Sequence, residues 1–404
     1  MVGTFVPGRG RRGPRSGVLP RIGGVTADLA RPALPLRPEL AGLEPYGAPQ
    51  LDVPILLNVN ENPYAPSEEV VADVARAVAD AARGLNRYPD RDFDALRADL
   101  ADYLAVESGV RVDPGQVWAA NGSNEIMLHV LQAFGGPGRT ALSFAPTYSM
   151  YPEYARDTST AWVTGRREED FGLDPDVARA TIAEHAPSVV LLASPNNPTG
   201  TALPASTVLA VLDAAAQVPG GCVVVVDEAY GEFRRRGTPS ALELLDDHPH
   251  LAVSRTMSKA FGLAGARVGY LAASTAFVDA LRVVRLPYHL SAVTQAVARA
   301  ALAHAPSLMA QVGALRDERD ALVVWLRERG LRVADSDANF VLFGTFDDRR
   351  AVWQGLLDRG VLIREVGPQG WLRVSVGTPQ ETAAFKDALT QVVGLVPAGS
   401  EEER

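Results

Sequence analysis

Three apolar runs, each followed at once by a polar cluster, constrain the fold of this 404-residue chain most. The runs are Val189–Ala193, Val223–Val226 and Leu251–Val253, and their length and composition predict buried strands. Helical stretches separate them along the chain. Continuous apolar strands that alternate with helices are typical of a parallel sheet covered on both faces. The sequence therefore predicts an α/β fold.

The polar clusters fall at the carboxyl ends of these three strands. They contain Asn197 after the first, Asp227 and Tyr230 at the end of the second, and Lys259 after the third. Ligands of such sheets bind outside the carboxyl ends of the strands. The sequence therefore predicts a binding site there, and three unrelated surface turns are the alternative.

Lys259 is unusual in its surroundings, because Thr256 and Ser258 flank it and Arg267 follows eight residues later. A lysine that forms a Schiff base must be partly desolvated to be a free amine near neutral pH. The two hydroxyls and the arginine could hold a phosphate. A lysine beside a phosphate cradle indicates pyridoxal phosphate, whereas an ordinary loop lysine is the alternative interpretation.

Two further elements fit a phosphorylated pyridine cofactor. Ser123 and Asn124 open a predicted helix, and free amides at a helix N-terminus bind anions. Asp227 is placed to keep a ring nitrogen protonated, since a buried carboxylate favours the nearby cation. Asn197 and Tyr230 can donate to a phenolate oxygen, and Tyr148 can stack on the ring face.

The composition excludes several other classes of function. A net charge of −9 gives no field that favours nucleic acid or an anionic membrane. No apolar run approaches the roughly 18 residues of a membrane span. The single cysteine, Cys222, excludes an intrachain disulfide and a thiolate-rich metal site, and the scattered histidines suggest no metal ligand set. We expect a cytoplasmic protein without a metal, and we expect His289 to pack near the site.

The two ends of the chain differ from its middle. Met1–Gly24 contains five arginines and no acid, with many Gly and Pro residues. A transit peptide is one interpretation, but Gly and Pro would break its amphipathic helix. We predict a disordered extension over residues 1–37 and a flexible acidic tail over 396–404. From Pro306 onward, a long helix and alternating strands predict an α+β region with a largely antiparallel sheet.

Several motifs occur together in the order found in one enzyme family. The sequence resembles the fold-type I pyridoxal-phosphate-dependent aminotransferases of class II, most closely the histidinol-phosphate aminotransferases, from about residue 38 to 395. The motifs are Asn60-Glu61-Asn62-Pro63-Tyr64, Arg87-Tyr88-Pro89, Asn121-Gly122-Ser123-Asn124-Glu125, Pro146-Thr147-Tyr148, Ser194-Pro195-Asn196-Asn197-Pro198-Thr199-Gly200, Asp227-Glu228-Ala229-Tyr230, Ser258-Lys259-Ala260-Phe261 with Arg267, Ala338-Asn339-Phe340, and Arg373. Glu44-Pro45-Tyr46-Gly47-Ala48-Pro49-Gln50 resembles the entry segment of some bacterial members.

The resemblance implies a two-domain fold and a dimer. A large cofactor-binding domain would span residues 76–299, and a smaller α+β domain would be built from 38–75 and 300–395. The family implies a homodimer in which Tyr88 reaches the cofactor phosphate of the neighbouring subunit. Arg373, helped by Arg364, would bind the anionic end of the substrate.

One departure from the family pattern concerns the N-terminal substrate contact. Some members place a tyrosine where this chain has Asn62, and here Tyr64 lies two residues further on. Both residues are therefore candidates for substrate binding.

The resemblance implies transamination between L-histidinol phosphate and 2-oxoglutarate in histidine biosynthesis. An aromatic amino-acid aminotransferase on the same scaffold is the nearest alternative, and a decarboxylase of an amino-acid phosphate is another. A non-catalytic pyridoxal-phosphate binder, such as the sensor half of a transcription regulator, is the alternative from a different class. About 30 Gly- and Pro-rich residues before the cofactor domain cannot form a winged helix, and Arg373 with Arg364 favours an enzyme.

Overall fold

The computed structural model describes residues 34–45 and 47–395. The chain divides into two units, Met1–Tyr46 and Gly47–Arg404, and the described part of the first contains a short 3-10 helix, η1 (Pro38–Leu40). Residues 1–33 of the predicted N-terminal extension, Tyr46 and the predicted tail 396–404 lie outside the described residues. All the other described helices and strands belong to the second unit.

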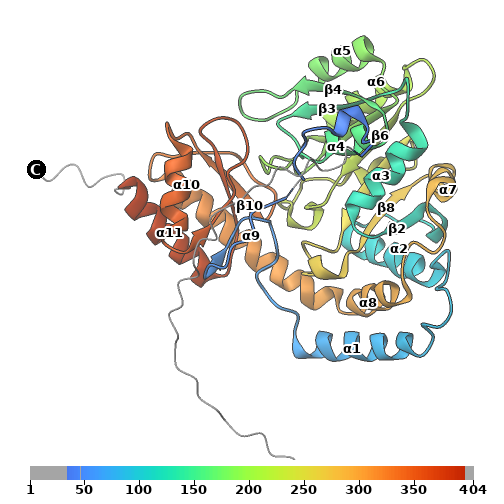
Figure 1. Ribbon diagram of the computed structural model, residues 1–404, viewed down its shortest axis with the longest axis horizontal. Coiled ribbons are helices and arrows are strands. Elements are labelled where there is room, and N and C mark those ends of the chain that lie inside the picture. Colours follow the sequence, from blue (N-terminus) through green and yellow to red (C-terminus); the bar gives the residue numbers. More distant parts are fainter. Residues whose placement is uncertain (1–33, 46, 396–404) are drawn as a thin grey trace, which may run out of the picture. The chain divides into compact units, whose positions relative to one another are not determined.

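The largest sheet among the described residues has seven strands and forms the middle of the larger part of this second unit (Figure 1). Its strands, in spatial order, are β2 (Val117–Ala120), β8 (Gly269–Ala273), β7 (Leu251–Thr256), β6 (Val223–Asp227), β5 (Val189–Ala193), β3 (Thr140–Ala145) and β4 (Ala161–Arg166). The five strands from β7 to β4 pair in parallel, and β8 is antiparallel to both β7 and β2. The predicted, mainly parallel sheet is confirmed.

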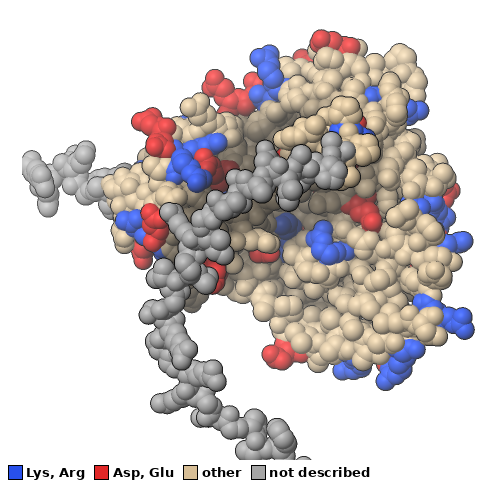
Figure 2. Space-filling model, in the orientation of Figure 1, with Lys and Arg blue, Asp and Glu red and all other residues tan. Residues whose placement is uncertain are grey.

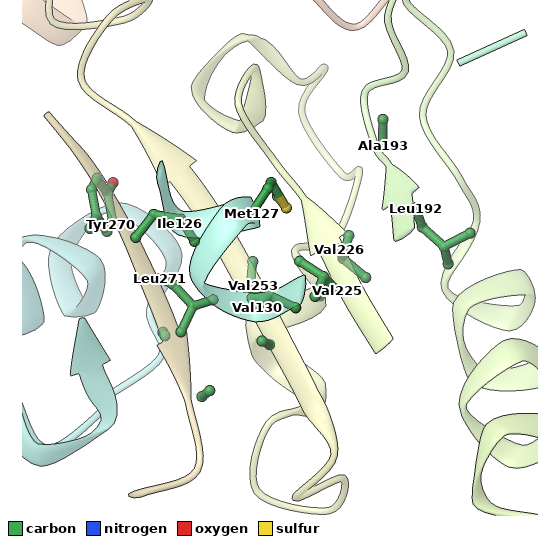
Figure 3. Packing of buried hydrophobic residues seen from close by; sticks show 14 of the residues in the cluster. Ile126, Met127, Val130, Leu192, Ala193, Val225, Val226, Val253, Tyr270 and Leu271 are labelled. Atoms are coloured by element: carbon green, nitrogen blue, oxygen red, sulfur yellow. The ribbon is translucent and has the colours of Figure 1, made fainter. Parts of the chain in front are cut away.

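Every residue of β5 and β7 is buried, so both faces of the sheet are covered in its middle. The helices of this part are α1 (Glu68–Ala82), α2 (Asp94–Ser108), α3 (Ser123–Phe134), α4 (Tyr151–Asp157), α5 (Pro175–His185), α6 (Ala205–Ala216), α7 (Thr275–Val284) and α8 (Ala292–Ala303). Figure 3 shows Ile126, Met127 and Val130 of α3 among side chains of β6, β7 and β8. This packing fixes the N-terminus of α3 relative to the sheet.

The sequence analysis did not identify β2, β4 and β8 as strands. β4 lies at the edge of the sheet and mixes exposed with buried residues, so it lacks a continuous apolar run. β8 is short and rich in small residues, with the sequence Gly-Tyr-Leu-Ala-Ala. Its position beside β7 follows from pairing across the sheet, which no local pattern predicts.

A second hydrophobic cluster joins residues from both ends of the unit, including Leu57, Leu326, Phe343, Leu372 and Phe385. The long helix α9 (Ala305–Arg327) leads into this part, and its other elements are β9 (Arg332–Val333), β10 (Phe340–Gly344), α10 (Arg349–Leu357), β11 (Val361–Leu362), β12 (Leu372–Ser375) and α11 (Pro379–Val393). Short 3-10 helices elsewhere in the unit are η2 (Pro114–Gln116), η3 (Gly231–Phe233), η4 (Ala241–Leu244) and η5 (Ala264–Ala266).

The antiparallel sheet predicted for the C-terminal part exists, with the order β12-β10-β9. β11 does not belong to it. It pairs in parallel with β1 (Ile55–Leu56), which lies about 300 residues earlier in the sequence. This pairing places the polar loop after Leu57 beside the C-terminal strands.

Local sequence signals define the start of α1. The Ser67 hydroxyl accepts a hydrogen bond from Val70 N at 3.4 Å, and Glu68 and Glu69 occupy the first turn of the helix. On the face shown in Figure 2, acidic and basic side chains are interspersed over the surface. Within the described ranges, no helix combines the length and apolar character needed to cross a bilayer.

Candidate functional site

The polar clusters after β5, β6 and β7 lie at one edge of the sheet. Asp227 is in register with Ala193 of β5 and Ser254 of β7. The backbone continues this pairing beyond the strands, because Ser194 N donates to Asp227 O at 3.0 Å and Glu228 N donates to Ser254 O at 2.8 Å. Parallel pairing thus brings together residues that lie far apart in the sequence.

Asp227 is a buried carboxylate with neutral partners. Its Oδ2 accepts from the Tyr151 hydroxyl at 3.0 Å, and its Oδ1 accepts from Ala229 N at 3.2 Å. Burial raises the pKa of Asp227 to about 6, although both hydrogen bonds oppose that rise. No cation pairs with this carboxylate among the described residues, so the site suits a ligand that brings a positive charge to it.

Lys259 follows β7 and is half-buried. Its Nζ donates to Val59 O at 2.9 Å, in the loop after β1. Burial lowers the pKa of Lys259 to about 8, and the charges of Arg373 and Arg267 act in the same direction while Glu61 opposes them. The uncharged fraction of this amine near neutral pH is therefore much larger than for an ordinary lysine, as a nucleophilic lysine requires.

An anion cradle forms where the N-terminus of α3 meets Arg267. The cradle consists of Ser123, Ser258 and Arg267, and two glycines make the approach possible. A Cβ on Gly122 would clash with the Arg267 guanidinium, and a Cβ on Gly269 would clash with Ser123 N. Arg267 Nη1 also lies 3.4 Å from Ser258 Oγ. Backbone amides, a hydroxyl and a guanidinium are suited to a phosphate group.

The other two residues predicted for the phosphate have different surroundings. Asn124 lies in the first turn of α3, where its Oδ1 is 3.4 Å from the Tyr148 hydroxyl. Thr256 is buried beneath the cradle, with its hydroxyl within hydrogen-bonding distance of Ser258 Oγ, Ser258 N and Val268 O. We therefore interpret Thr256 as a support for Ser258, and its contact with a phosphate stays a prediction.

Asn197 and Tyr230 contact each other after β5 and β6. Asn197 Nδ2 lies 3.5 Å from the Tyr230 hydroxyl, which also accepts from Asn60 Nδ2 at 3.0 Å. The Tyr230 ring packs edge-on against Phe340, with the ring centroids 5.0 Å apart. The Tyr230 hydroxyl therefore contacts both Asn197 and Asn60, and Asn60 belongs to the loop after β1.

Arg373 and Arg364 lie on adjacent positions of the C-terminal part. Their backbones exchange two hydrogen bonds, each 2.9 Å long. The Arg373 side chain is buried, and it donates to Asn197 Oδ1 at 2.6 Å and to Asn58 O at 2.8 Å. Arg364 is half-exposed, and its guanidinium has a long contact of 3.5 Å to Gly47 O. Arg373 thus joins the other predicted site residues, and Arg364 lies at their margin.

Asn62 and Tyr64 are parts of one tight loop near the lysine segment. Asn62 Oδ1 accepts from Tyr64 N at 3.0 Å, and Asn62 Nδ2 donates to Ala260 O at 3.3 Å. These contacts shape the loop, and a contact of either side chain with substrate stays a prediction. Tyr88 is 80% exposed and stacks on Tyr288, with ring centroids 4.5 Å apart.

The sequence analysis did not predict two of the residues that the structure places in the site. Tyr151 follows Tyr148 by three positions, and a second tyrosine at the start of a helix beside the site was the available signal. Asn60 belongs to the polar motif after Leu57, yet only the fold shows that it contacts Tyr230. Asn60 N also donates to Ser375 Oγ at 2.8 Å, so its position depends on β12.

A buried ion cluster supports the strand ends from behind. Arg255, four residues before Lys259, is fully buried and lies within 3.2 Å of carboxylate oxygens of Glu107, Glu228 and Glu232. Burial alone would raise the pKa of Glu228, but Arg255 and Arg234 hold it below its usual value. Since Glu228 follows Asp227, this cluster ties the ends of β6 and β7 together.

His289 has the expected packing role. Its ring stacks on Trp118, with centroids 5.3 Å apart, and its Nε2 lies 2.9 Å from Ala119 O. The backbone oxygen of His289 accepts from Asn121 Nδ2 at 2.9 Å, just before the cradle. Within the described residues, no group of three or more His, Cys, Asp or Glu side chains could hold a metal ion.

The arrangement fits pyridoxal phosphate. One edge of the mainly parallel sheet brings together three features: a buried carboxylate without a cation, an amine with a lowered pKa and an anion cradle. These are the groups that a phosphorylated pyridine aldehyde requires: a partner for the ring nitrogen, a nucleophile for the aldehyde and donors for the phosphate. The fold and site thus define a candidate pyridoxal-phosphate-dependent enzyme.

Comparisons with known proteins identify the family. Residues 52–389 match the model of the class I and II aminotransferases. The histidinol-phosphate aminotransferase of Thermobifida fusca is 64% identical over 361 residues, covering 89% of this chain and 96% of that protein. That of Bifidobacterium longum is 57% identical over 378 residues, covering 90% and 98%. The chain therefore belongs to the class I and II aminotransferases, among the histidinol-phosphate aminotransferases.

A solved structure shares this fold. The histidinol-phosphate aminotransferase of Sinorhizobium meliloti, determined in complex with pyridoxal-5'-phosphate, matches with a TM-score of 0.76 and 26% identity. The match covers 85% of this chain and 91% of that one. An aspartate aminotransferase of Thermus thermophilus with maleate matches with a TM-score of 0.72 and 25% identity, covering 84% and 92%. The predicted fold class and cofactor are confirmed.

Proposed function

We propose that this protein transfers the amino group of L-histidinol phosphate to 2-oxoglutarate, which gives imidazole acetol phosphate and glutamate in histidine biosynthesis. The relatives at 64% and 57% identity carry the name of this activity and support it. Within the molecule, the observation that carries the proposal is the buried guanidinium of Arg373, whose charge adds to burial in lowering the pKa of Lys259. A fixed cation beside the reactive amine suits a substrate with an anionic end.

The cofactor would be held through its phosphate, its ring nitrogen, its ring face and its phenolate oxygen. Ser123, Asn124, Ser258 and Arg267 would hold the phosphate, with Thr256 supporting Ser258. Asp227 would pair with the ring nitrogen and keep it protonated. Tyr148 would cover the ring face, and Asn197 and Tyr230 would donate to the phenolate oxygen.

When bound, pyridoxal phosphate supplies an electron sink for the charge that develops at the substrate carbon that loses its proton. Lys259 is the group that moves this proton as general base and then as general acid. Its pKa of about 8 keeps both protonation states accessible near neutral pH. The hydrogen bond from Nζ to Val59 O shows that the amine can turn toward the loop after β1.

The two substrates carry different anions at the end that Arg373 would bind. Glutamate has an α-carboxylate, whereas histidinol phosphate has a phosphoester there. A guanidinium can pair in a bidentate manner with either anion, and Arg364, whose backbone is paired with that of Arg373, would add charge for the phosphate dianion. Asn62 and Tyr64 would border the other side of the substrate.

We also propose a cytoplasmic homodimer with shared sites. Tyr88 would reach the cofactor phosphate of the neighbouring subunit, and its 80% exposure within one subunit supports this role. The proposed domains are a cofactor domain of residues 76–299 and a smaller domain of 38–75 and 300–395. The two hydrophobic clusters support a division into two parts, but the first cluster continues past residue 299 into α9, and the proposed boundaries at 75/76 and 299/300 fall within α1 and α8.

The proposed substrate is tested by kcat/KM for histidinol phosphate against histidinol, phenylalanine and tyrosine, with 2-oxoglutarate as the acceptor. We expect the phosphoester to be preferred by at least about 2 kcal/mol, the scale of one lost charged contact. Histidinol is the matched control because it lacks only the phosphate. Equal or faster turnover of phenylalanine would instead identify an aromatic amino-acid aminotransferase.

A further inference from the structure

The Asp227 carboxylate is fixed by one donor on each oxygen. Ala229 N, from the turn after β6, lies 3.2 Å from Oδ1, and the Tyr151 hydroxyl lies 3.0 Å from Oδ2. The backbone donor belongs to the same turn as Asp227 and would move with it. Tyr151 comes from another element, the first turn of α4, so it is the contact that fixes the carboxylate relative to the rest of the site.

Tyr151 is itself held firmly. Its side chain is fully buried, and its ring meets that of Tyr148 edge-on, with centroids 5.5 Å apart and an angle of 89° between the planes. Tyr148 is the residue proposed to cover the cofactor ring. The segment from Tyr148 to Tyr151 thus joins the stacking surface to the carboxylate that would receive the ring nitrogen.

The chemistry of the donor matters because Tyr151 is neutral. Burial and the neighbouring carboxylate of Asp227 both raise the pKa of Tyr151 well above its usual value, so its hydroxyl stays protonated. A neutral donor favours the ionised carboxylate and leaves its negative charge uncompensated. The other titratable groups that act on this pair are Tyr148, Tyr154, Glu228 and Arg167.

We propose that Tyr151 is a positioning residue whose hydroxyl holds the Asp227 carboxylate in the orientation and the ionised state that pair with the cofactor's ring nitrogen. This inference rests on the proposed function only for the identity of the cofactor. It adds a second requirement to the site: the carboxylate must be held by a donor that does not neutralise it. Tyr151 would act through Asp227 and would not touch the cofactor itself.

The test measures cofactor binding in the full-length protein, independently of any amino donor. Tyr151→Phe keeps the buried ring and removes only the hydroxyl. We expect the Kd for pyridoxal phosphate to rise between about tenfold and a hundredfold, the equivalent of one charge-assisted hydrogen bond. We also expect the pH below which binding weakens to move upward by about one unit, since the carboxylate would lose a donor that favours its ionised form.

A double-mutant cycle distinguishes positioning from a general structural role. In an Asp227→Asn background, Tyr151→Phe should change the Kd by less than about twofold, because the charge that Tyr151 serves is gone. The matched control is Tyr270→Phe, which removes another buried hydroxyl that has no hydrogen-bond partner among the described residues. We expect this control to bind the cofactor as the unchanged protein does.

Three results would overturn the inference. They are an unchanged Kd and pH dependence for Tyr151→Phe, an equal loss in Tyr270→Phe, and full additivity with Asp227→Asn. None of these measurements depends on which amino donor the enzyme prefers. A wrong substrate would therefore leave the cofactor-binding results intact, whereas a wrong role for Tyr151 would leave the substrate preference intact.

Discussion

Arg373 donates from Nη1 to Asn197 Oδ1 at 2.6 Å and thereby joins strand β12 to the turn after β5. Asn197 also lies 3.5 Å from the Tyr230 hydroxyl. The proposed anion-binding arginine and the proposed donors to the cofactor's phenolate oxygen thus belong to one hydrogen-bonded set. A substitution of Arg373 should therefore also affect the binding of the cofactor.

Arg373→Ala should lower kcat/KM for both glutamate and histidinol phosphate by about tenfold or more, because it removes a buried charged contact to both anions. Arg364→Ala is the comparison variant, since Arg364 occupies the paired ladder position but is less buried. We expect its effect to be smaller and greater for the phosphoester than for glutamate. Equal losses in the two variants would contradict the assignment of Arg373 as the principal anion site.

Lys259→Ala should abolish turnover, and borohydride reduction should no longer attach the cofactor to the protein, because the nucleophilic amine is missing. Lys386 is the matched control, since Lys259 and Lys386 are the only lysines in the sequence. Lys386→Ala should retain full activity and labelling. The measurement is the mass of the reduced protein and of its peptides. A label at Lys386, or activity above that of free cofactor in Lys259→Ala, would refute the central assignment.

Asp227→Asn should still bind pyridoxal phosphate but lose at least about tenfold in kcat, or about 1.4 kcal/mol of transition-state stabilisation, since the ring nitrogen would no longer be held protonated. The assay compares kcat of cofactor-saturated proteins. A smaller loss would mean that another group performs this role.

The same substitution should stabilise the cofactor-free protein at neutral pH. The folded pKa of Asp227 is about 6, above the unfolded value of about 3.9, so folding binds this proton more tightly. The resulting stability is present below about pH 4 and is lost as pH rises through about 6, by roughly 3 kcal/mol. In urea denaturation of the cofactor-free proteins at about pH 7, Asp227→Asn should therefore have a higher free energy of unfolding than the unchanged protein. This difference should vanish near pH 4. An unchanged difference across this range would contradict the raised pKa.

A mixture of Tyr88→Phe and Lys259→Ala subunits should be more active than either parent if the sites are shared. In the mixed dimer, the site with an intact Lys259 would receive Tyr88 from the partner, which restores one unchanged site. The control mixes Tyr88→Phe with a subunit that carries both substitutions, which restores none. The assay is activity after subunit exchange, with mass measured by light scattering. A fully active monomer would exclude this arrangement.

The sequence was sufficient to predict those site residues that directly follow apolar strands. Asp227 and Lys259 stand where a continuous buried run gives way to polar residues, and parallel pairing then places such ends at one edge. Lys259 could be singled out because its neighbours suit a phosphate. The helix start at Ser123 was equally readable, since its anion-binding amides follow from local geometry.

The remaining contacts depend on packing between distant elements. Tyr151 is one tyrosine among ten, and only the packing of α4 against the sheet brings its hydroxyl to Asp227. Asn60 reaches Tyr230 because β1 pairs with β11, an association that two short strands do not reveal in sequence. The surroundings of Thr256 could not be predicted for a similar reason. Its hydroxyl, which was expected to hold a phosphate, forms hydrogen bonds with Ser258 N and Val268 O within the protein.

The loop from Asn58 to Asn62 is held by the last quarter of the chain. Asn60 N donates to Ser375 Oγ at 2.8 Å, and Asn60 O accepts from Asn339 Nδ2 at 3.0 Å. Arg373 fixes Asn58 O in the same way. During synthesis on the ribosome, this loop must therefore wait for some 300 further residues before it can take its final conformation. A nascent chain released early would carry Lys259, Asp227 and the loop, but it would lack Asn339, Arg373 and Ser375, which hold the loop in place, so the site is completed only after these residues have been synthesised.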